Sequence, residues 1–145
     1  MAELYKNMQQ RGEPVVNTAE IIKLEKGRPG EAFARCAEVI KTGGVIAYPT
    51  DTFYGLGADP RNPRAVSKVF EIKGRGADQP SLLLLHDRSE VTAWTSSVTP
   101  SAERLMDRFW PGPLTLVFTA RPDISPELTG GTGTIGLRVP GNEVT

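Results

Sequence analysis

One segment of the chain places hydroxyl and carboxylate side chains directly after a short apolar run. Val45 to Tyr48 is predicted to be a buried strand, and Pro49-Thr50-Asp51-Thr52 follows it in a constrained loop that contains Gly55 and Gly57. Ligands of open α/β sheets bind at the C-terminal ends of strands, so these side chains are placed to contact a ligand. A turn in which Asp51 and the threonines bond backbone amides explains the same residues. The residues alone leave both interpretations open.

Two cations follow a second predicted element. Lys73 and Arg75 leave the end of a helix, and Gly76 and Pro80 come after them. Cations at this end complement the negative end of the helix dipole, which is a purely structural reason for their presence. Arg75 also offers a planar fork for a carboxylate or phosphate, with Lys73 as a point charge. Local chemistry favours neither explanation.

A third pattern has the spacing of a dinucleotide-binding loop. Gly131, Gly133 and Gly136 match G-x-G-x-x-G. That motif must follow a strand and open a helix, with an acidic residue further on. Here Pro126 to Gly133 is predicted to be a glycine-rich loop that leads into a strand, Thr134 to Val139. The spacing is therefore attributed to an ordinary glycine loop.

The elements that must position these groups alternate between strands and helices. Strands are predicted around Ile21 to Leu24, then at Val45 to Tyr48, Ser81 to Leu85, Leu114 to Ala120 and Thr134 to Val139. Helices are predicted at Glu31 to Lys41, from Pro63 to about Ile72, and from Pro100 to the residues before Pro111. This alternation predicts a twisted α/β sheet with helices packed on it.

The patterns also predict which side chains are buried. The first helix is expected to bury Phe33, Cys36, Ala37 and Ile40, and to end at Gly43 and Gly44. The second is expected to be capped by Asn62, with Val66, Val69 and Phe70 turned inward. The segment Leu114 to Ala120 is mostly apolar and does not alternate strictly between apolar and polar residues, so we expect a strand covered on both faces.

Composition narrows the class of protein. Lys+Arg and Asp+Glu are both 17, so no net charge attracts the chain to nucleic acid or membrane over a distance. The single Cys36 forms no internal disulfide, and no paired Cys/His metal spacing occurs in the sequence. No apolar stretch reaches signal-peptide or membrane-spanning length. We expect a cytoplasmic domain at 18–145, preceded by a flexible N-terminal arm at 1–17, without a protein-bound metal or a membrane partner.

Four motifs in order resemble the YrdC-type threonylcarbamoyl-adenylate synthases. They are Pro49-Thr50-Asp51-Thr52-Phe53-Tyr54-Gly55-Leu56-Gly57, Lys73-Gly74-Arg75, Trp110-Pro111-Gly112-Pro113-Leu114-Thr115 and Gly136-Leu137-Arg138-Val139-Pro140. The resemblance covers about Ile21 to Pro140. It implies an α/β fold with a twisted, open mixed sheet and packed helices, as in YrdC.

The resemblance also implies the site residues. Thr52 matches a position that holds the substrate threonine. Arg138 matches the arginine that receives the carboxylate of that threonine. The implied contacts with ATP are Lys73, Arg75, Gln79 and Thr134, with Gln79 in place of an asparagine. Lys73 and Arg75 are the implied catalytic pair. Forked and point cations and hydroxyl donors suit carboxylate and triphosphate groups.

The implied activity joins L-threonine, bicarbonate or CO2, and ATP into threonylcarbamoyl-AMP and pyrophosphate. Mg²⁺ is expected on the ATP phosphates, and the product would pass to a transferase complex that modifies tRNA. Two other functions stay open. The chain could be a non-catalytic RNA-binding module of the same fold, or a relative that handles carbamoyl-adenylate.

The chain departs from the family pattern in places. Gly76 replaces a proline that often follows the Lys-x-Arg element, and Leu84 stands where some members have a histidine that touches threonine. His86 is expected to be a surface histidine, since no partner makes it a base or a ligand. No Ser-x-Asn, the family's last site motif, occurs in the sequence, so we expect a C-terminally incomplete domain with weak ATP binding and turnover.

Overall fold

The computed structural model describes residues 19–24, 29–50, 53–74, 76, 79–142 and 144. The chain divides into two compact units, 1–34 and 35–145. The predicted arm at 1–17 and the predicted site residues Thr52 and Arg75 lie outside the described residues.

The strand predicted around Ile21 to Leu24 is wrong. Residues 19–24 have no regular secondary structure, and the side chain of Ile21 is 85% exposed. A strand is held by the hydrogen-bond ladder to a neighbour, and none of the described strands pairs with these residues. The apolar pattern of these residues alone was therefore insufficient to predict a strand.

The first helix, α2, spans Pro29–Lys41 and ends as predicted at glycines. Gly43 has a φ of +77°, and the amide of Gly44 donates to the carbonyl of Val39 at 2.8 Å. The positions with buried or half-buried side chains are Ala32, Cys36, Val39 and Ile40. The expected burial of Phe33 and Ala37 is wrong, because the apolar stripe begins one residue earlier and leaves Phe33 42% exposed.

A short antiparallel hairpin follows. Strand β1, Ile46–Tyr48, pairs with β2, Gly55–Gly57, with Tyr48 opposite Gly55. The second half of the predicted loop is thus a strand. The ring of Tyr48 explains the glycine at position 57: a Cβ there would lie 2.7 Å from its Cε1 atom, so the ring packs across a surface that only glycine leaves free.

Helix α3, Pro63–Lys73, forms as predicted. The side chain of Asn62 accepts hydrogen bonds from the amides of Arg64 and Ala65, and Gly74 ends the helix in the left-handed conformation. Val66 is buried, and Val69 and Phe70 are half-buried, as expected.

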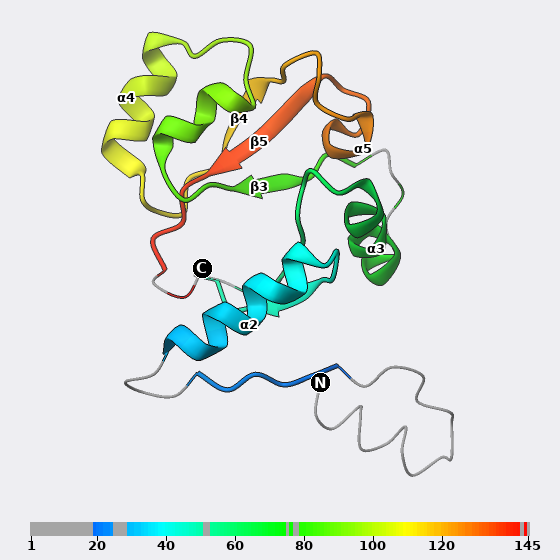
Figure 1. Ribbon diagram of the computed structural model, residues 1–145. Helices are drawn as coiled ribbons and strands as arrows, with labels where there is room; N and C mark the ends of the chain where they lie inside the picture. The colour runs from blue at the N-terminus through cyan, green and yellow to red at the C-terminus, as the bar shows by residue number, and fades with distance from the viewer. Residues whose placement is uncertain are drawn as a thin grey trace. The chain divides into compact units, whose positions relative to one another are not determined.

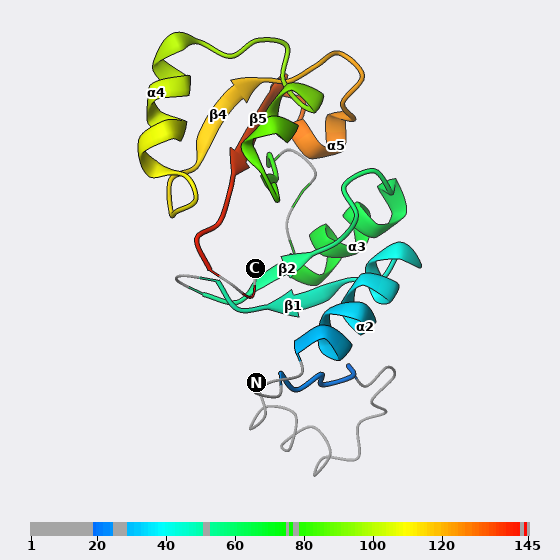
Figure 2. The same ribbon diagram turned by 60° about the vertical axis from the view of Figure 1, so that its left-hand side comes forward.

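The larger sheet of the described residues has three strands in the order β3-β5-β4 (Figures 1 and 2). They are β3, Leu82–Leu84, β4, Leu116–Thr119, and β5, Thr134–Arg138. β5 pairs in parallel with β3 and antiparallel with β4. The sheet is therefore mixed, as the fold class predicted.

The core lies against one face of this sheet. Ile135 and Leu137 of β5 are fully buried, and the next strands add Leu83 and Phe118. Four helical segments contribute to the same core: α3, through Val66, the 3₁₀ helix η1, Arg88–Ala93, and the α-helices α4, Pro100–Phe109, and α5, Pro126–Thr129.

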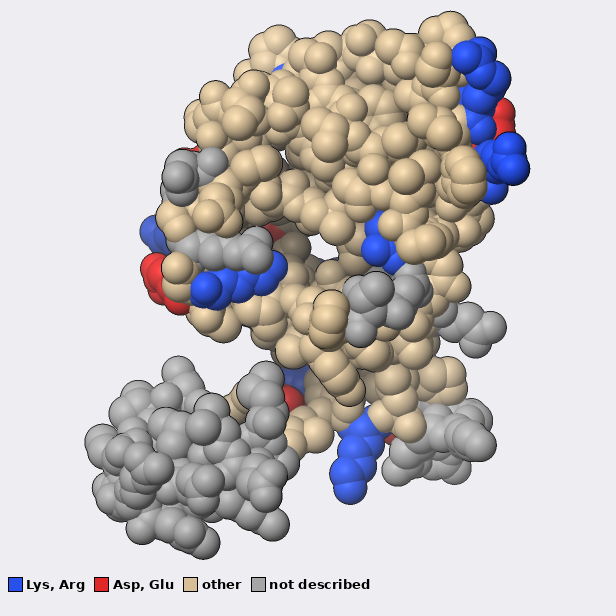
Figure 3. Space-filling model, turned by 180° about the vertical axis from the view of Figure 1, so that it is seen from behind, with Lys and Arg blue, Asp and Glu red and all other residues tan. Residues whose placement is uncertain are grey.

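The expectation that Leu114 to Ala120 is covered on both faces is wrong. In β4 Phe118 is buried, whereas Val117 is 70% exposed. The core covers one face of the strand, and no described element covers the other, so an apolar run does not imply two buried faces. Seen from behind, the surface over this part of the chain is mostly uncharged, with Lys, Arg, Asp and Glu at its margins (Figure 3).

None of the helices in the described ranges is both long and apolar enough to cross a membrane.

Candidate functional site

The open face of β5 carries two of the predicted site residues. Successive side chains of a strand alternate between faces, so Thr134, Gly136 and Arg138 lie opposite the buried Ile135 and Leu137. Thr134 begins the strand and Arg138 ends it, which separates their Cα atoms by about 13 Å at roughly 3.3 Å per residue. Both side chains are half-buried. The strand thus places a hydroxyl and a guanidinium at the two ends of one face.

Arg138 is held by the turn before β4. Its Nε donates to the carbonyl oxygen of Gly112 at 2.9 Å, and the amide of Gly112 donates to the carbonyl of Val139 at 2.9 Å. The turn also has an internal hydrogen bond, in which Nε1 of Trp110 donates to the carbonyl of Leu114 at 2.7 Å. The Trp-Pro-Gly-Pro-Leu-Thr segment therefore orients the arginine.

Arg138 also acts on the hairpin. Burial raises the pKa of the Tyr48 phenol, and the positive charge of Arg138 opposes that shift. Tyr48 ends β1, directly before Pro49 and Thr50. Strands β1 and β5 belong to different sheets. Electrostatic proximity, instead of strand pairing, relates the two segments.

In the described part of the hydroxyl-rich segment, the side chain of Thr50 bonds backbone groups of Phe53. Thr50 Oγ1 donates a hydrogen bond to the carbonyl of Phe53 at 2.6 Å. The amide of Phe53 donates in turn to Thr50 Oγ1 at 3.3 Å. At Thr50 the side chain thus satisfies backbone groups, as the turn interpretation expects. Thr52 lies outside the described residues, so its predicted contact with threonine stays a prediction.

Thr134 is linked to the glycine-rich turn before it. Its Oγ1 lies 2.8 Å from Oγ1 of Thr132, and its amide donates to that oxygen at 3.2 Å. Gly131 and Gly133 have φ values of +72° and +70°, which side chains rarely adopt. β5 follows, not a helix, so the G-x-G-x-x-G spacing belongs to a glycine turn, as predicted.

The two remaining described candidates are exposed. Lys73 is the last residue of α3, and Gln79 follows shortly after, with its amide 3.4 Å from the carbonyl of Gly76. Lys73 suits the negative end of the helix dipole as well as it suits a phosphate. Arg75 lies outside the described residues. The nucleotide contacts of all three stay predictions.

The departure from the family pattern at Leu84 lies next to Arg138 in the sheet. Leu84 pairs with Arg138, so the position where some family members have a threonine-contacting histidine is the neighbour of the predicted carboxylate ligand. His86 is exposed, as expected of a surface histidine.

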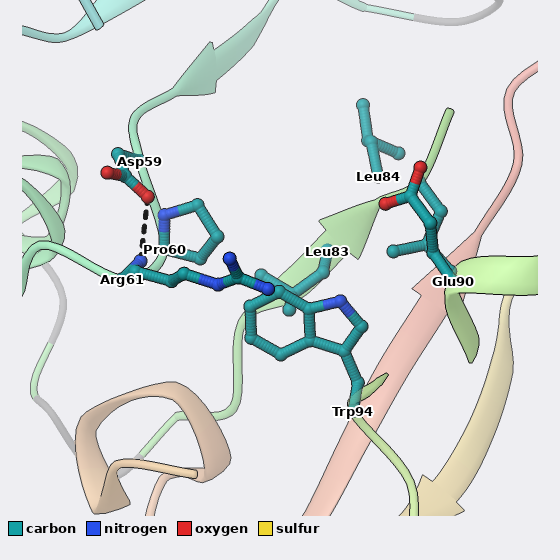
Figure 4. A pocket seen from close by; sticks show the side chains of 8 residues that line it. Asp59, Pro60, Arg61, Leu83, Leu84, Glu90 and Trp94 are labelled. Carbon is teal, nitrogen blue, oxygen red and sulfur yellow. Dashed lines mark hydrogen bonds between the residues drawn. The ribbon is translucent and has the colours of Figure 1, made fainter. Parts of the chain in front are cut away.

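A separate cavity of about 300 Å³ lies between the segment after β2, strand β3 and η1. Figure 4 shows the Arg61 guanidinium over the indole of Trp94, 5.4 Å from its centroid, while the Arg61 amide donates to Asp59 at 2.9 Å. Glu90 also lines the cavity. The predicted site residues Lys73, Gln79, Thr134 and Arg138 are not among its lining residues.

Sequence reasoning assigned no role to Tyr48 or Gly112. Gly112 belongs to a motif that carries the family resemblance, and Tyr48 directly precedes another, which was the available indication. The hydrogen bond of Arg138 to Gly112 and its electrostatic influence on Tyr48 join chain segments far apart in the sequence, and no local pattern reveals them.

Comparison with known proteins adds an independent finding. A family model for Sua5, YciO and YrdC proteins, described as "Telomere recombination", matches residues 38–145. The threonylcarbamoyl-AMP synthase of Bacillus subtilis is 42% identical over 108 residues, which is 74% of this chain and 31% of that protein. The threonylcarbamoyl-AMP synthase of Pyrococcus abyssi is 36% identical over 130 residues, which is 90% of this chain and 36% of that protein.

A solved structure is similar as well. The crystal structure of P. abyssi Sua5 complexed with L-threonine has a TM-score of 0.75 and 37% sequence identity, and the match covers 78% of this chain and 33% of that one. The chain thus spans about a third of the length of these relatives.

Proposed function

Because the chain belongs to the Sua5/YciO/YrdC family, we propose that it is part of an L-threonylcarbamoyladenylate synthase, which forms threonylcarbamoyl-AMP and pyrophosphate from L-threonine, bicarbonate or CO2, and ATP. The observation that carries the proposal is the open face of β5, with Arg138 held at one end and Thr134 at the other. Relatives that bear the name threonylcarbamoyl-AMP synthase support it.

The site is suited to binding two anions side by side. Arg138 has a planar guanidinium that is oriented by the bond from its Nε to Gly112, and such a group suits the threonine carboxylate. Thr134 offers a hydroxyl to the nucleotide, and Lys73, Arg75 and Gln79 are the further proposed contacts. A threonine-bound structure of a relative supports the choice of amino acid.

The chemistry needs no protein nucleophile. The amine of threonine takes up CO2 and loses a proton, which gives a carbamate. A carbamate oxygen then attacks the α-phosphorus of ATP, and the bond from that phosphorus to the bridging oxygen breaks to release pyrophosphate. The protein contributes alignment of the two reactants and positive charge near the phosphates, the usual means of accelerating such transfers. Lys73 and Arg75 are the proposed cations.

Mg²⁺ would be carried by the phosphate oxygens of ATP, neutralising their charge. Among the described residues, no group of three or more His, Cys, Asp or Glu side chains is placed to hold a metal ion. The proposed setting is the cytoplasm, where the product would pass to a complex that modifies tRNA.

Pyrophosphate release from ATP tests the proposal. We expect release that requires threonine and bicarbonate together, and that stops when either is omitted. Release driven by carbamoyl phosphate without threonine would instead identify a carbamoyl-adenylate enzyme. Binding of RNA, with no response of the protein to threonine and ATP, would identify an RNA-binding module.

A further inference from the structure

The cavity beside β3 has the size and the lining of a small-molecule site. Its volume is about 300 Å³, at the lower end of the range of roughly 300 to 1,000 Å³ that is usual for such sites. Leucine side chains and Pro60 form its apolar wall, and its ionisable lining residues are Asp59, Arg61 and Glu90. The few polar groups of such a pocket fix which ligand it takes.

The indole nitrogen of Trp94 is an available hydrogen-bond donor in this cavity. Trp94 is only 8% exposed, and within the described part of the chain its Nε1 makes no hydrogen bond. Every buried side-chain nitrogen or oxygen of the described residues has a partner, so Nε1 of Trp94 must be accessible. Figure 4 shows this nitrogen on the side of the ring that faces Leu84 and Glu90. The N–H of a largely buried tryptophan usually has an acceptor, which a bound molecule can supply here.

The Arg61 guanidinium lies over the same ring and has no carboxylate partner. Its Cζ atom is 5.4 Å from the indole centroid, a cation–π contact that fixes the group in place. None of the ion pairs between described side chains includes Arg61. The carboxylate of Asp59 instead accepts from the backbone amide of Arg61 at 2.9 Å. Arg61 and Trp94 therefore offer two donors, and a ligand carboxylate has two oxygens to accept from them.

Glu90 places a negative charge at another part of the cavity wall. It lies in the first turn of η1 with an exposed side chain, and the described ion pairs do not include it. Figure 4 shows it on the side of Leu84, away from Asp59. A ligand with only a negative charge would be repelled by Glu90, and one with only a positive charge by Arg61. The lining therefore favours a zwitterion.

Strand β3 adds apolar surface and a free backbone edge. The amide of Leu85 donates to the carbonyl of Arg138 at 2.8 Å, so the amide and carbonyl of Leu84 point to the opposite edge of the strand. Among the described strands β3 pairs only with β5, which leaves that edge unpaired. The lining leucines, Leu83 to Leu85, suit an aliphatic group.

We propose that this cavity is a binding site for a small zwitterion, an α-amino acid with an aliphatic side chain. Its carboxylate accepts from the Arg61 guanidinium and from Nε1 of Trp94, and its ammonium group donates to Glu90. Its side chain packs against the leucines of β3. The inference does not depend on the proposed function, because the residues that it uses are not those assigned to the synthesis of threonylcarbamoyl-AMP.

The two tryptophans of the chain allow a direct test with L-leucine as the probe. Each indole N–H gives its own signal in a proton–nitrogen correlation NMR spectrum, and Trp94→Phe shows which signal belongs to Trp94. We expect leucine to shift the Trp94 signal and to leave the Trp110 signal in place, since Nε1 of Trp110 is bonded to Leu114.

Two analogues of leucine separate the contributions of its charges. Isocaproate has the same carbon skeleton without the amine, and isoamylamine has it without the carboxylate. Each should bind at least about tenfold more weakly than leucine, because a charged group of the cavity is then left without its partner.

Substitutions in the cavity test the same two contacts. Arg61→Gln and Glu90→Gln should each lower leucine affinity about tenfold or more. Glu90→Gln should leave the affinity for isocaproate unreduced, because that ligand has no amine. Arg64→Gln and Glu103→Gln are the matched controls, since both side chains are exposed and neither lines the cavity. Both controls should bind leucine as the wild type does.

A Trp94 signal that does not move with leucine overturns the proposal. Equal affinities for leucine and isocaproate, or unchanged leucine affinity in Arg61→Gln and Glu90→Gln, would show an apolar cavity without charge recognition and would overturn it too. An equal response to threonine would remove the preference for an aliphatic side chain. Pyrophosphate release is measured separately, so the failure of either proposal leaves the other standing.

Discussion

Nε of Arg138 donates a hydrogen bond to the carbonyl oxygen of Gly112 at 2.9 Å, which joins the end of β5 to the turn before β4. The turn is itself tied back, through the amide of Gly112, to the carbonyl of Val139. The guanidinium is thereby oriented before any ligand arrives. A preoriented fork loses less conformational freedom on binding than a free side chain would.

Arg138→Lys should weaken threonine binding while ATP binding changes little. Lysine keeps the charge but loses both the bond to Gly112 and the bidentate geometry. Loss of one charge-assisted hydrogen bond corresponds to roughly 1.5 to 3 kcal/mol, about a 10- to 150-fold fall in affinity. Calorimetric titrations with threonine and with ATP measure the two effects. Equal losses for both ligands would show that Arg138 does not discriminate between them.

Thr52→Ala should act on the same ligand. If Thr52 and Arg138 share one threonine molecule, the effects of Thr52→Ala and Arg138→Lys on threonine affinity should be non-additive. The double variant, measured by calorimetry beside each single variant, supplies the coupling. Strictly additive losses would remove Thr52 from the threonine site.

Lys73→Ala should reduce ATP affinity with little effect on stability. The side chain is exposed, and such substitutions usually change the free energy of unfolding by less than about 0.5 kcal/mol. Lys68→Ala on the same helix is the matched control, since Lys68 Nζ donates to the carbonyl of Gly43 at 2.8 Å. That variant should lose stability and keep its ATP affinity. The reverse pattern in thermal unfolding and ATP titration would make Lys73 structural.

Tyr48→Phe should make the protein less sensitive to high pH. Burial raises the pKa of the Tyr48 phenol above its value in the unfolded chain. The contribution of this shift to the free energy of unfolding is fully present below the unfolded pKa of about 10 and is lost as the pH rises through the folded pKa. Between these two pKa values the native state binds more protons than the unfolded state, so stability falls as the pH rises. The free energy of unfolding measured in urea between about pH 9 and 11 should therefore fall less steeply in the variant. Tyr54→Phe, at a side chain that is 77% exposed, is the matched control for loss of a phenol oxygen.

Gly57→Ala should destabilise the hairpin. Its Cβ would lie 2.7 Å from Cε1 of Tyr48, so the ring must move. Overpacking of this kind typically costs about 1 to 3 kcal/mol. Chemical denaturation gives the change, and the double variant Gly57→Ala with Tyr48→Ala should show a smaller penalty at Gly57, since the clashing ring is gone. An unchanged penalty would point to the backbone instead of the ring.

How far the sequence alone predicts this protein depends on the range of the contacts involved. Asn62 and Pro63 specify the start of α3, and Gly43 and Gly74 the ends of two helices, because caps and left-handed turns involve neighbouring residues. The alternation of β5 indicates which residues are buried. The four motifs indicate the family, and the match over 38–145 agrees with them.

Other features were decided only by tertiary structure. Gly55 and Gly57, which were predicted to lie in a loop, form a strand because they pair with β1, and the ring of Tyr48 packs against them. The apolar residues at Ile21 and Val117 stay exposed because no described element covers them. Arg138 is oriented by Gly112, 26 residues away, and adjoins Leu84 through the register of β3 and β5. Local patterns determine caps, turns and which face of β5 is apolar, whereas pairing and packing depend on segments that meet only in the folded chain.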